Sequence, residues 1–239
     1  MEPQTINDSV EMHSIIAKDY AKNLTMEESH QYAHEISKIL PIKRGDVILD
    51  VGAGSGRITK AILEDHPYIK TYYALEPSKL ADYFMVNDDR VELFRCLGQD
   101  IPLSDNMCDL SFASEVFCHL KETQDQIDIL REMQRVTKIG GFVCILTTPI
   151  NDTIISLYAR IFRRPREHYF KPQSKPDENG RDVFFYRRRY LMGEVKSLLR
   201  NSNLTLIRMI PGHKKFGPFN VYLHVIAQKR ESPSCRDSL

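Results

Sequence analysis

The residues with the clearest chemical potential form a glycine-rich segment in the first quarter of the chain. An apolar run, 47–49, stops at Asp50, and glycine then occupies alternate positions: Gly52, Gly54 and Gly56. Glycine lets the backbone turn tightly and lets a ligand lie against the main chain without meeting a Cβ. A helix-like pattern follows over 58–65, and the start of a helix attracts negative charge. The segment therefore predicts a strand, a loop and a helix that bind a nucleotide.

The glycine spacing separates two kinds of nucleotide site. The dinucleotide fingerprint G-x-G-x-x-G requires a third glycine at position 57, where this chain has Arg57. The glycines instead read G-x-G-x-G, and Asp50 lies two residues before the first of them. An NAD-dependent oxidoreductase is therefore a disfavoured alternative.

Further polar residues follow two other predicted strands. Glu76 comes directly after the apolar run 71–75, and Ser114 and Glu115 follow the run that begins at residue 109. A carboxylate offers two oxygens in a fork, so Glu76 can accept hydrogen bonds from both hydroxyls of a ribose. Ligand crevices open at the carboxyl ends of parallel strands, which is where all these residues are expected. His119, just beyond, is the best-placed general base for an acceptor that must lose a proton.

Apolar patterns predict the elements that position these residues. Continuous apolar strands alternate with helical patterns, which is typical of a parallel sheet covered on both faces. Strands are expected at 47–51, 71–75, 91–96, 109–114, 142–148, 204–210 and 221–227, and helices at 14–24, 27–40, 58–65, 80–86, 122–137 and from 190. Gly140 and Gly141 are expected to end the helix at 122–137. The last two strands have no helix between them, so they must pair antiparallel or separate.

The same patterns predict the domain organisation. Residues 1–12 are expected to be a flexible N-terminus, 13–228 a single domain with N-terminal helices at 13–41, and 229–239 a disordered tail. Residues 150–189 break the alternation and are expected to form an inserted lid. Between residues 158 and 189 there are ten Lys or Arg against four Asp or Glu, interleaved with aromatic residues. The insert is interpreted as a lid over an anionic or aromatic ligand, with a nucleic-acid patch or a solvated loop as alternatives. Arg187, Arg188 and Arg189 are expected to be a solvated charge run.

Composition restricts the class of protein. The 239 residues carry a formal net charge of +1, which disfavours an electrostatic nucleic-acid binder. The five cysteines are odd in number and scattered, so neither a disulfide framework nor a zinc site is expected. No His, Asp or Glu cluster has metal-ligand spacing. There is no signal-peptide pattern, and no apolar run approaches the roughly 20 residues that cross a bilayer. A soluble protein of the reducing cytoplasm is expected.

Several segments, taken in order, resemble the class I S-adenosylmethionine (SAM)-dependent methyltransferases, in particular the small-molecule type 11 and ubiquinone-biosynthesis-like group. The loop at 50–56 resembles the family's motif I, and Glu76 stands where the family places its ribose-binding acid. Residues 101–109 (IPLSDNMCD) resemble the family's LPFPDNSFD, and 114–120 (SEVFCHL) resemble SEVLHHL. Residues 132–141 (EMQRVTKIGG) resemble E-x-x-R-V-L-K-P-G-G, and 16–20 (IAKDY) resemble the upstream IAxxYD.

This resemblance implies a Rossmann-like three-layer sandwich with a seven-stranded, mostly parallel sheet whose last strand is antiparallel. It implies methyl transfer from SAM to a small-molecule acceptor, with S-adenosylhomocysteine as the product. The implied SAM-binding residues are Tyr20, Asp50, Gly52, Gly54, Gly56, Arg57, Glu76, Ser114 and Glu115. Asp50 is expected either to orient the loop or to bind the SAM amine. His119 is the candidate catalytic residue, with a substrate-pocket or packing role as the alternative.

The chain departs from the family pattern at one position. Many relatives carry an Asp after the third strand that binds the adenine amino group, and the alignment places Leu97 there. Adenine is therefore expected to contact Leu97 and backbone groups near Gly98 and Gln99. The rival functions are an RNA or protein methyltransferase that uses the basic insert, and a non-catalytic SAM-binding partner or activator subunit.

Overall fold

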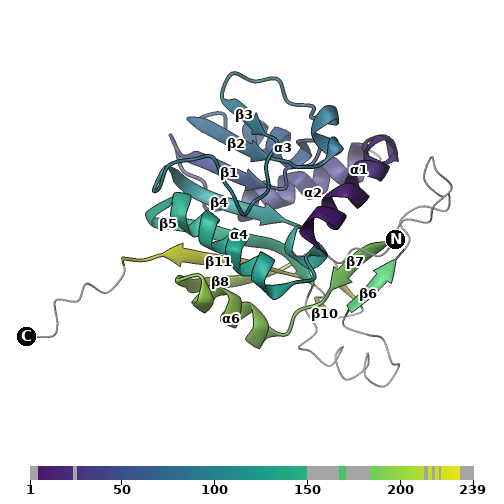
Figure 1. Cartoon of the computed structure of the whole chain (residues 1–239). Coiled ribbons are helices and arrows are strands. Elements are labelled where there is room, and N and C mark those ends of the chain that lie inside the picture. Colours follow the sequence, from purple (N-terminus) through teal and green to yellow (C-terminus); the bar gives the residue numbers. More distant parts are fainter. Residues whose placement is uncertain are drawn as a thin grey trace, which may run out of the picture.

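A computed structural model of the chain describes residues 5–23, 26–149, 167–170, 184–212, 215–216, 219–220 and 222–231. Seven strands form one sheet in the order β3-β2-β1-β4-β5-β11-β8 (Figure 1). They are β1 (Val47–Val51), β2 (Thr71–Leu75), β3 (Val91–Phe94), β4 (Cys108–Ser114), β5 (Thr137–Pro149), β8 (Leu204–Pro211) and β11 (Tyr222–Lys229). Strands β3, β2, β1, β4 and β5 pair in parallel, and β11 is antiparallel to both β5 and β8. The mostly parallel sheet and the antiparallel last strand are confirmed.

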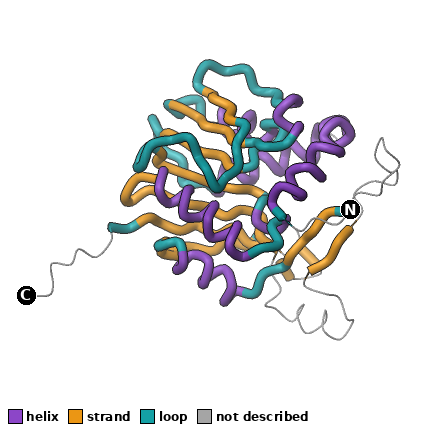
Figure 2. The backbone as a smooth tube through the Cα atoms, in the orientation of Figure 1, coloured by secondary structure: helices purple, strands orange, loops and turns teal. Residues whose placement is uncertain are grey.

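Helices cover both faces of the sheet (Figure 2). They are α1 (Ile6–Asn23), α2 (Met26–Ile39), α3 (Arg57–Asp65), α4 (Thr123–Val136) and α6 (Met192–Asn201), with short 3₁₀ turns η1 (Lys79–Tyr83) and η2 (Phe117–His119). Alternate residues of a strand point to opposite faces. Leu49 therefore packs in a core layer with α4 and α6, whereas its neighbour Ile48 packs in a second layer with α2 and α3. The three-layer sandwich follows from this alternation.

Helix α1 begins earlier than the apolar pattern indicates. The expectation of a flexible segment at 1–12 is wrong for residues 6–12, which are helical. The Thr5 amide donates to Asp8 Oδ2 at 2.9 Å, and the Asp8 amide donates to Thr5 Oγ1 at 3.2 Å. This reciprocal cap satisfies amides that the start of a helix leaves without partners. Met12 is buried in the same cluster as Ile16, so the helix is held against the domain.

The end of α4 also differs from expectation. Gly140 and Gly141 do not terminate the helix, because they lie inside β5, which begins at Thr137. A Cβ at Gly141 would lie 2.8 Å from the carbonyl oxygen of Asp109, so glycine permits the close approach of β5 to β4. The Thr137 hydroxyl donates to the carbonyl of Met133 at 2.6 Å and fixes the turn from helix to strand.

The two segments expected to be loose or inserted are described in part. Lys229 belongs to β11, and its ammonium group donates to the carbonyls of Thr137 at 2.8 Å and Arg135 at 3.2 Å, so the tail does not begin there. Residues 232–239 lie outside the described residues. Of the predicted lid, only 167–170 and 184–189 are described, and β6 (Glu167–Phe170) pairs antiparallel with β7 (Phe185–Arg188). Two shorter strands, β9 (Lys215–Phe216) and β10 (Phe219–Asn220), form a separate pair.

The arginines 187–189 are not simply a solvated charge run. Arg188 Nη2 donates to Glu194 Oε1 at 2.9 Å, and its guanidinium carbon lies 5.3 Å from the centre of the Tyr190 ring. Arg187 is 24% exposed and lies in the wall of the cavity described below. The prediction fails for Arg188 because Glu194 and Tyr190 lie beside its guanidinium. The run of three arginines in the sequence does not reveal either neighbour.

Arg135 joins α4 to the loop between β3 and β4. Its guanidinium donates to Glu132 at 2.7 and 2.8 Å, to Asp105 at 2.8 Å, and to the carbonyls of Leu103 and Ile101 at 2.8 and 2.9 Å. Lysine has no planar fork and cannot reproduce these contacts. Arg135→Lys is expected to lower the free energy of unfolding by about 2–4 kcal/mol. Urea denaturation measures it, and Arg131→Lys on the same helix, 58% exposed, is the control with a cost below about 0.5 kcal/mol.

Candidate functional site

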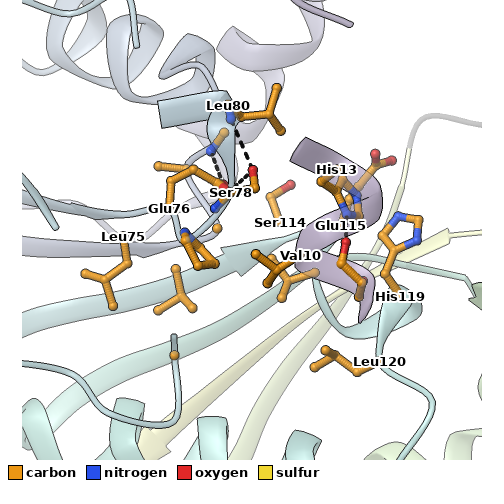
Figure 3. Close-up of a pocket in the computed structure, with 18 of the residues that line it drawn as sticks. Val10, His13, Leu75, Glu76, Ser78, Leu80, Ser114, Glu115, His119 and Leu120 are labelled. Atoms are coloured by element: carbon orange, nitrogen blue, oxygen red, sulfur yellow. Dashed lines mark hydrogen bonds between the residues drawn. The ribbon is translucent and has the colours of Figure 1, made fainter. Parts of the chain in front are cut away.

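A cavity of about 390 Å³ opens where β1, β2 and β4 end, beneath α1 (Figure 3). Its volume falls in the usual range for small-molecule sites. Nine of the sequence-predicted residues line it: Gly52, Gly54, Arg57, Glu76, Leu97, Gly98, Ser114, Glu115 and His119. They come from segments up to 67 positions apart, between 52 and 119, and the parallel sheet brings them to one edge. This is the place where a doubly wound fold binds its ligand.

Glu76 ties the glycine loop to the end of β2. Its Oε2 accepts the Gly54 amide at 2.8 Å, and its Oε1 accepts the amide and hydroxyl of Ser78 at 2.9 and 2.5 Å (Figure 3). The side chain is buried, with 6% of the residue exposed. A carboxylate oxygen has two acceptor sites, so Oε2 retains one for a ligand hydroxyl. Glu76 can therefore bind the Gly54 amide and offer an acceptor to a ligand in the cavity at the same time.

The three glycines of the loop have different structural reasons. All have positive φ values, of 78°, 59° and 81° in chain order, which side chains with a Cβ adopt at a cost. A Cβ on Gly52 would collide with the Val116 side chain, and one on Gly56 would lie 2.7 Å from the Phe84 ring. A Cβ on Gly54 would meet nothing within 4 Å. Gly54 thus leaves space in the cavity wall, whereas Gly56 serves packing and does not line the cavity.

Asp50 lies beneath the loop and outside the cavity lining. Its residue is 1% exposed, and its Oδ2 accepts the Tyr72 hydroxyl at 2.9 Å and the Thr59 hydroxyl at 3.5 Å. Burial raises the pKa of this carboxyl from 3.8 to about 7; the Tyr72 hydrogen bond lowers the pKa, and the charge of Glu76 raises it. Of the two expected roles, this position favours orienting the loop over binding an amine.

The raised pKa of Asp50 predicts a pH-dependent stability. In the unfolded chain the carboxyl ionises near its ordinary pKa of 3.8, so its contribution is complete below that pH and is lost as pH rises through about 7. Asp50→Asn stays neutral. Its free energy of unfolding relative to wild type is therefore expected to rise by roughly 2–3 kcal/mol between pH 5 and pH 8. Denaturation at both pH values measures this, and an unchanged difference would contradict it. Asp88→Asn is the control, because Arg90 lowers the pKa of Asp88 to about 2, below this window.

The predicted adenine end is only partly in the cavity wall. Leu97 and Gly98 line the cavity, and a Cβ on Gly98 would lie 2.9 Å from Val51 Cγ1, so glycine is required there for packing. The Gln99 side-chain amide donates to Asp125 Oδ1 at 2.7 Å and does not line the cavity. Leu97 is therefore an apolar part of the cavity wall at the position where the resemblance led us to expect the adenine contact.

Two further expected contacts have different outcomes. Arg57 is the first residue of α3 and lines the cavity next to the glycine loop. Tyr20 belongs to α1, but its side chain lies outside the described residues. Its expected role over the cofactor remains a prediction.

Four residues that no sequence motif predicts enter the cavity from outside the strand ends. His13 comes from α1, Tyr32 from α2, and Phe185 and Arg187 from β7. The Tyr32 hydroxyl lies 3.2 Å from Ser114 Oγ. Tyr32 lies on the inward-facing side of its helix, where it packs partly buried against the core. The apolar pattern does not identify His13, because the helix that it predicts begins at residue 14.

His119 is in the cavity wall but is poorly suited to be a general base. Its Nδ1 lies 2.9 Å from the carbonyl oxygen of Tyr186 on β7. Burial lowers the pKa of His119 to about 3, helped by the neighbouring His13. General bases work best when their pKa lies near the working pH. The alternative role of His119 as a substrate-pocket residue fits this position better.

Two kinds of feature are absent from the described residues. Among them, no three or more His, Cys, Asp or Glu side chains are grouped so as to hold a metal ion. None of the described helices is both long enough and apolar enough to cross a membrane.

Comparison with known proteins connects this geometry to a family. Residues 49–145 match the family model described as a methyltransferase domain. The chain is 30% identical over 115 residues to malonyl-[acyl-carrier protein] O-methyltransferase of Marinomonas sp., covering 46% of this chain and 40% of that protein. The chain thus spans less than half of that relative's length. It is 23% identical over 201 residues to demethylmenaquinone methyltransferase of Staphylococcus carnosus, covering 75% of this chain and 82% of that protein.

A solved structure shows the same fold. A chain from the complex between the Haloferax volcanii Trm112 methyltransferase activator and a putative methyltransferase superposes with a TM-score of 0.64 at 16% identity, covering 94% of this chain and 98% of that one. The matched segment 49–145 contains the glycine loop, Glu76 and the Ser114-Glu115 turn, which are the residues that the cavity brings together. Residues 49–145 thus match a methyltransferase domain, and these cavity residues lie within the matched segment.

Proposed function

We propose that the protein binds SAM in this cavity and transfers its methyl group to a small-molecule acceptor. The observation that carries the proposal is the arrangement of Glu76 and Gly54. One carboxylate oxygen of Glu76 holds the loop amide and retains an acceptor site toward the cavity, and the neighbouring loop position leaves open space where a Cβ would otherwise intrude. A ribose hydroxyl and an adjacent amino-acid moiety fit such a wall.

The residues of the chain have separate roles in this proposal. Glu76 binds the ribose, Gly52 and Gly54 admit the methionine portion against the backbone, and Leu97 and Gly98 contact the adenine. When bound, SAM supplies an activated methyl group on a sulfonium. The protein then needs mainly to hold the acceptor in line and exclude water, and orientation alone can contribute roughly 7–11 kcal/mol to lowering the barrier. A dedicated base is needed only if the acceptor arrives protonated.

The small-molecule acceptor is supported by the shape of the site. Residues of α1 and η2 line the cavity, and several of its lining side chains are apolar, among them Val10, Leu120 and Phe185. Arg187 Nη2 lies 3.9 Å from Glu115 Oε1, so a positive charge there already has an acidic neighbour. This favours the aromatic alternative for the acceptor over the anionic one.

Calorimetry with the full chain tests the cofactor assignment. We expect micromolar binding of SAM and S-adenosylhomocysteine, no binding of NAD, and release of S-adenosylhomocysteine on incubation with a panel of phenols, quinols and carboxylic acids. Binding of NAD without SAM would overturn the proposal. SAM binding without turnover on any acceptor would favour a non-catalytic partner subunit, and salt-sensitive retention on RNA would favour a nucleic-acid substrate.

A further inference from the structure

Two histidines that the proposed chemistry does not use meet at one end of the cavity. The ring of His13 on α1 and the ring of His119 at the end of η2 lie edge to face, with centroids 5.3 Å apart (Figure 3). Phe185 closes the cluster, with its ring centroid 4.6 Å from that of His13. All three residues line the cavity. Two elements distant in sequence thus converge here.

The backbone fixes which ring nitrogen of each histidine faces the cavity. His13 Nδ1 lies 2.7 Å from the carbonyl oxygen of Ser9, and His119 Nδ1 lies 2.9 Å from that of Tyr186. A carbonyl oxygen only accepts hydrogen bonds, so in each neutral ring Nδ1 carries the proton and Nε2 is an acceptor. Neither Nε2 atom has a hydrogen-bond partner among the described residues. Neither belongs to the fully buried side-chain atoms that lack a partner, so each has accessible surface. Both are therefore accessible from the cavity.

The surroundings keep both rings neutral. Burial lowers the pKa of His13 and of His119, and each protonated ring would repel the other. The charged groups that act on the pair are Glu76 on the side of His13 and Arg187 on the side of His119. Glu115, which lies 3.9 Å from Arg187, lines the same cavity. The polar atoms that the pair offers to a ligand are thus two hydrogen-bond acceptors.

We propose that the Nε2 atoms of His13 and His119 bind a hydrogen-bond donor of the methyl acceptor, so that the site selects neutral acceptors bearing an O–H or N–H group. The inference rests on the proposed function and names its substrate class. A carboxylate would direct lone pairs against lone pairs here, and protonating a buried ring to receive it is costly. The position agrees with the sheet order. In the sheet, β1 lies between β2 and β4. Glu76 follows β2, the glycine loop follows β1, and His119 lies beyond the end of β4, so the glycine loop separates Glu76 from His119.

A set of three naphthalenes tests the donor requirement. The full chain, saturated with S-adenosylhomocysteine, is titrated with 2-naphthol, 2-methoxynaphthalene and 2-naphthoate by calorimetry or fluorescence. These probes share an apolar body and differ in having a donor, an acceptor only, or a negative charge. We expect 2-naphthol to bind about tenfold more tightly than the other two, which corresponds to one or two hydrogen bonds to buried acceptors. Equal affinities, or preference for 2-naphthoate, would overturn the inference.

Two substitutions at each histidine separate recognition from folding. Asparagine reaches the Nδ1 position, so His13→Asn and His119→Asn keep the backbone contact and lose the acceptor at Nε2. Glutamine reaches the Nε2 position and restores an acceptor there. We expect each Asn variant to lose about threefold to tenfold in 2-naphthol affinity, each Gln variant to recover part of that loss, and 2-methoxynaphthalene affinity to stay constant. Parallel losses for both probes would indicate a packing role and contradict the inference.

The same samples separate failure of the inference from failure of the proposed function. If SAM and S-adenosylhomocysteine do not bind to wild type, the proposed function fails. If both bind and the naphthalene affinities do not distinguish donor from acceptor, only the histidine inference fails. The thermal midpoint of each variant, measured with S-adenosylhomocysteine present, verifies that the cofactor half is intact.

Discussion

Replacing Glu76 with alanine is expected to weaken SAM binding by at least about 100-fold. Hydrogen bonds to a charged group contribute about 1.5–3 kcal/mol each. In the proposed complex the variant loses those to the ribose, together with the one that fixes the Gly54 amide. Glu76→Gln is expected to lose nearly as much. All the groups bonded to the carboxylate donate to it, namely the Gly54 amide and the amide and hydroxyl of Ser78, and an amide nitrogen would oppose a donor.

Calorimetric titration of SAM into each variant measures the loss. Glu92→Gln on β3 removes one exposed carboxylate outside the cavity and should bind SAM like wild type. Ser78→Ala leaves the carboxylate in place but removes one of its donors, so a smaller loss, of about threefold to tenfold, is expected. A Glu76→Ala protein that unfolds normally and binds SAM within threefold of wild type would show that the ribose lies elsewhere.

Replacing Gly52 with alanine is expected to lower the free energy of unfolding by about 3 kcal/mol and to abolish measurable SAM binding. The left-handed backbone, at φ 78°, contributes about 1 kcal/mol of the cost. The collision of the new Cβ with Val116 adds about 1–3 kcal/mol of overpacking. The loop is also anchored from behind, since the amides of Gly52 and Ala53 both donate to the Leu75 carbonyl, at 2.8 and 2.9 Å. The loop cannot shift without losing those hydrogen bonds. The Val116 side chain, which lines the cavity, must therefore move instead.

Three variants separate backbone strain from collision. Gly45→Ala has φ 82° and no atom within 4 Å of the new Cβ, so it should cost about 1 kcal/mol and leave SAM binding unchanged. Gly54→Ala has the same kind of strain but places its Cβ in the open wall, so binding should fall with little further loss of stability. Adding Val116→Ala to Gly52→Ala should recover the packing part of the stability loss. Denaturation midpoints for the four proteins decide this, and a Gly52→Ala cost equal to that of Gly45→Ala would contradict the collision.

The sheet was predictable because its central strands are buried on both faces. Apolar runs such as 71–75 and 142–146 have no polar–apolar alternation, so their position in a parallel sheet follows directly. The boundaries were less predictable where a tertiary contact decides them. Thr137 ends α4 through its hydrogen bond to the Met133 carbonyl. Gly141 lies within a strand, where the close Asp109 carbonyl leaves no room for a Cβ. Neither contact has a local sequence pattern.

The candidate site divides in the same way. Residues at strand ends, such as Glu76 and Ser114, were predictable because topology alone brings them to one edge. His13 was not, because it reaches the cavity from a helix whose start depends on the Thr5 and Asp8 cap. The partner of His119 was not either, since the Tyr186 carbonyl lies 67 positions further along the chain. Contacts made by backbone carbonyls carry no side-chain signature.

The position of β11 has a consequence for how the chain is completed during synthesis. β11 lies between β5 and β8 and pairs with both, although it follows them in the chain. Until residues 222–229 have left the ribosome, β5 exposes an unpaired edge and the α6–β8 unit has no strand to join. The five parallel strands and the cavity edge that holds Glu76 are synthesised well before that. The five parallel strands can therefore pair before β11 is available. β11 then pairs with the free edge of β5 and joins the α6–β8 unit to the sheet.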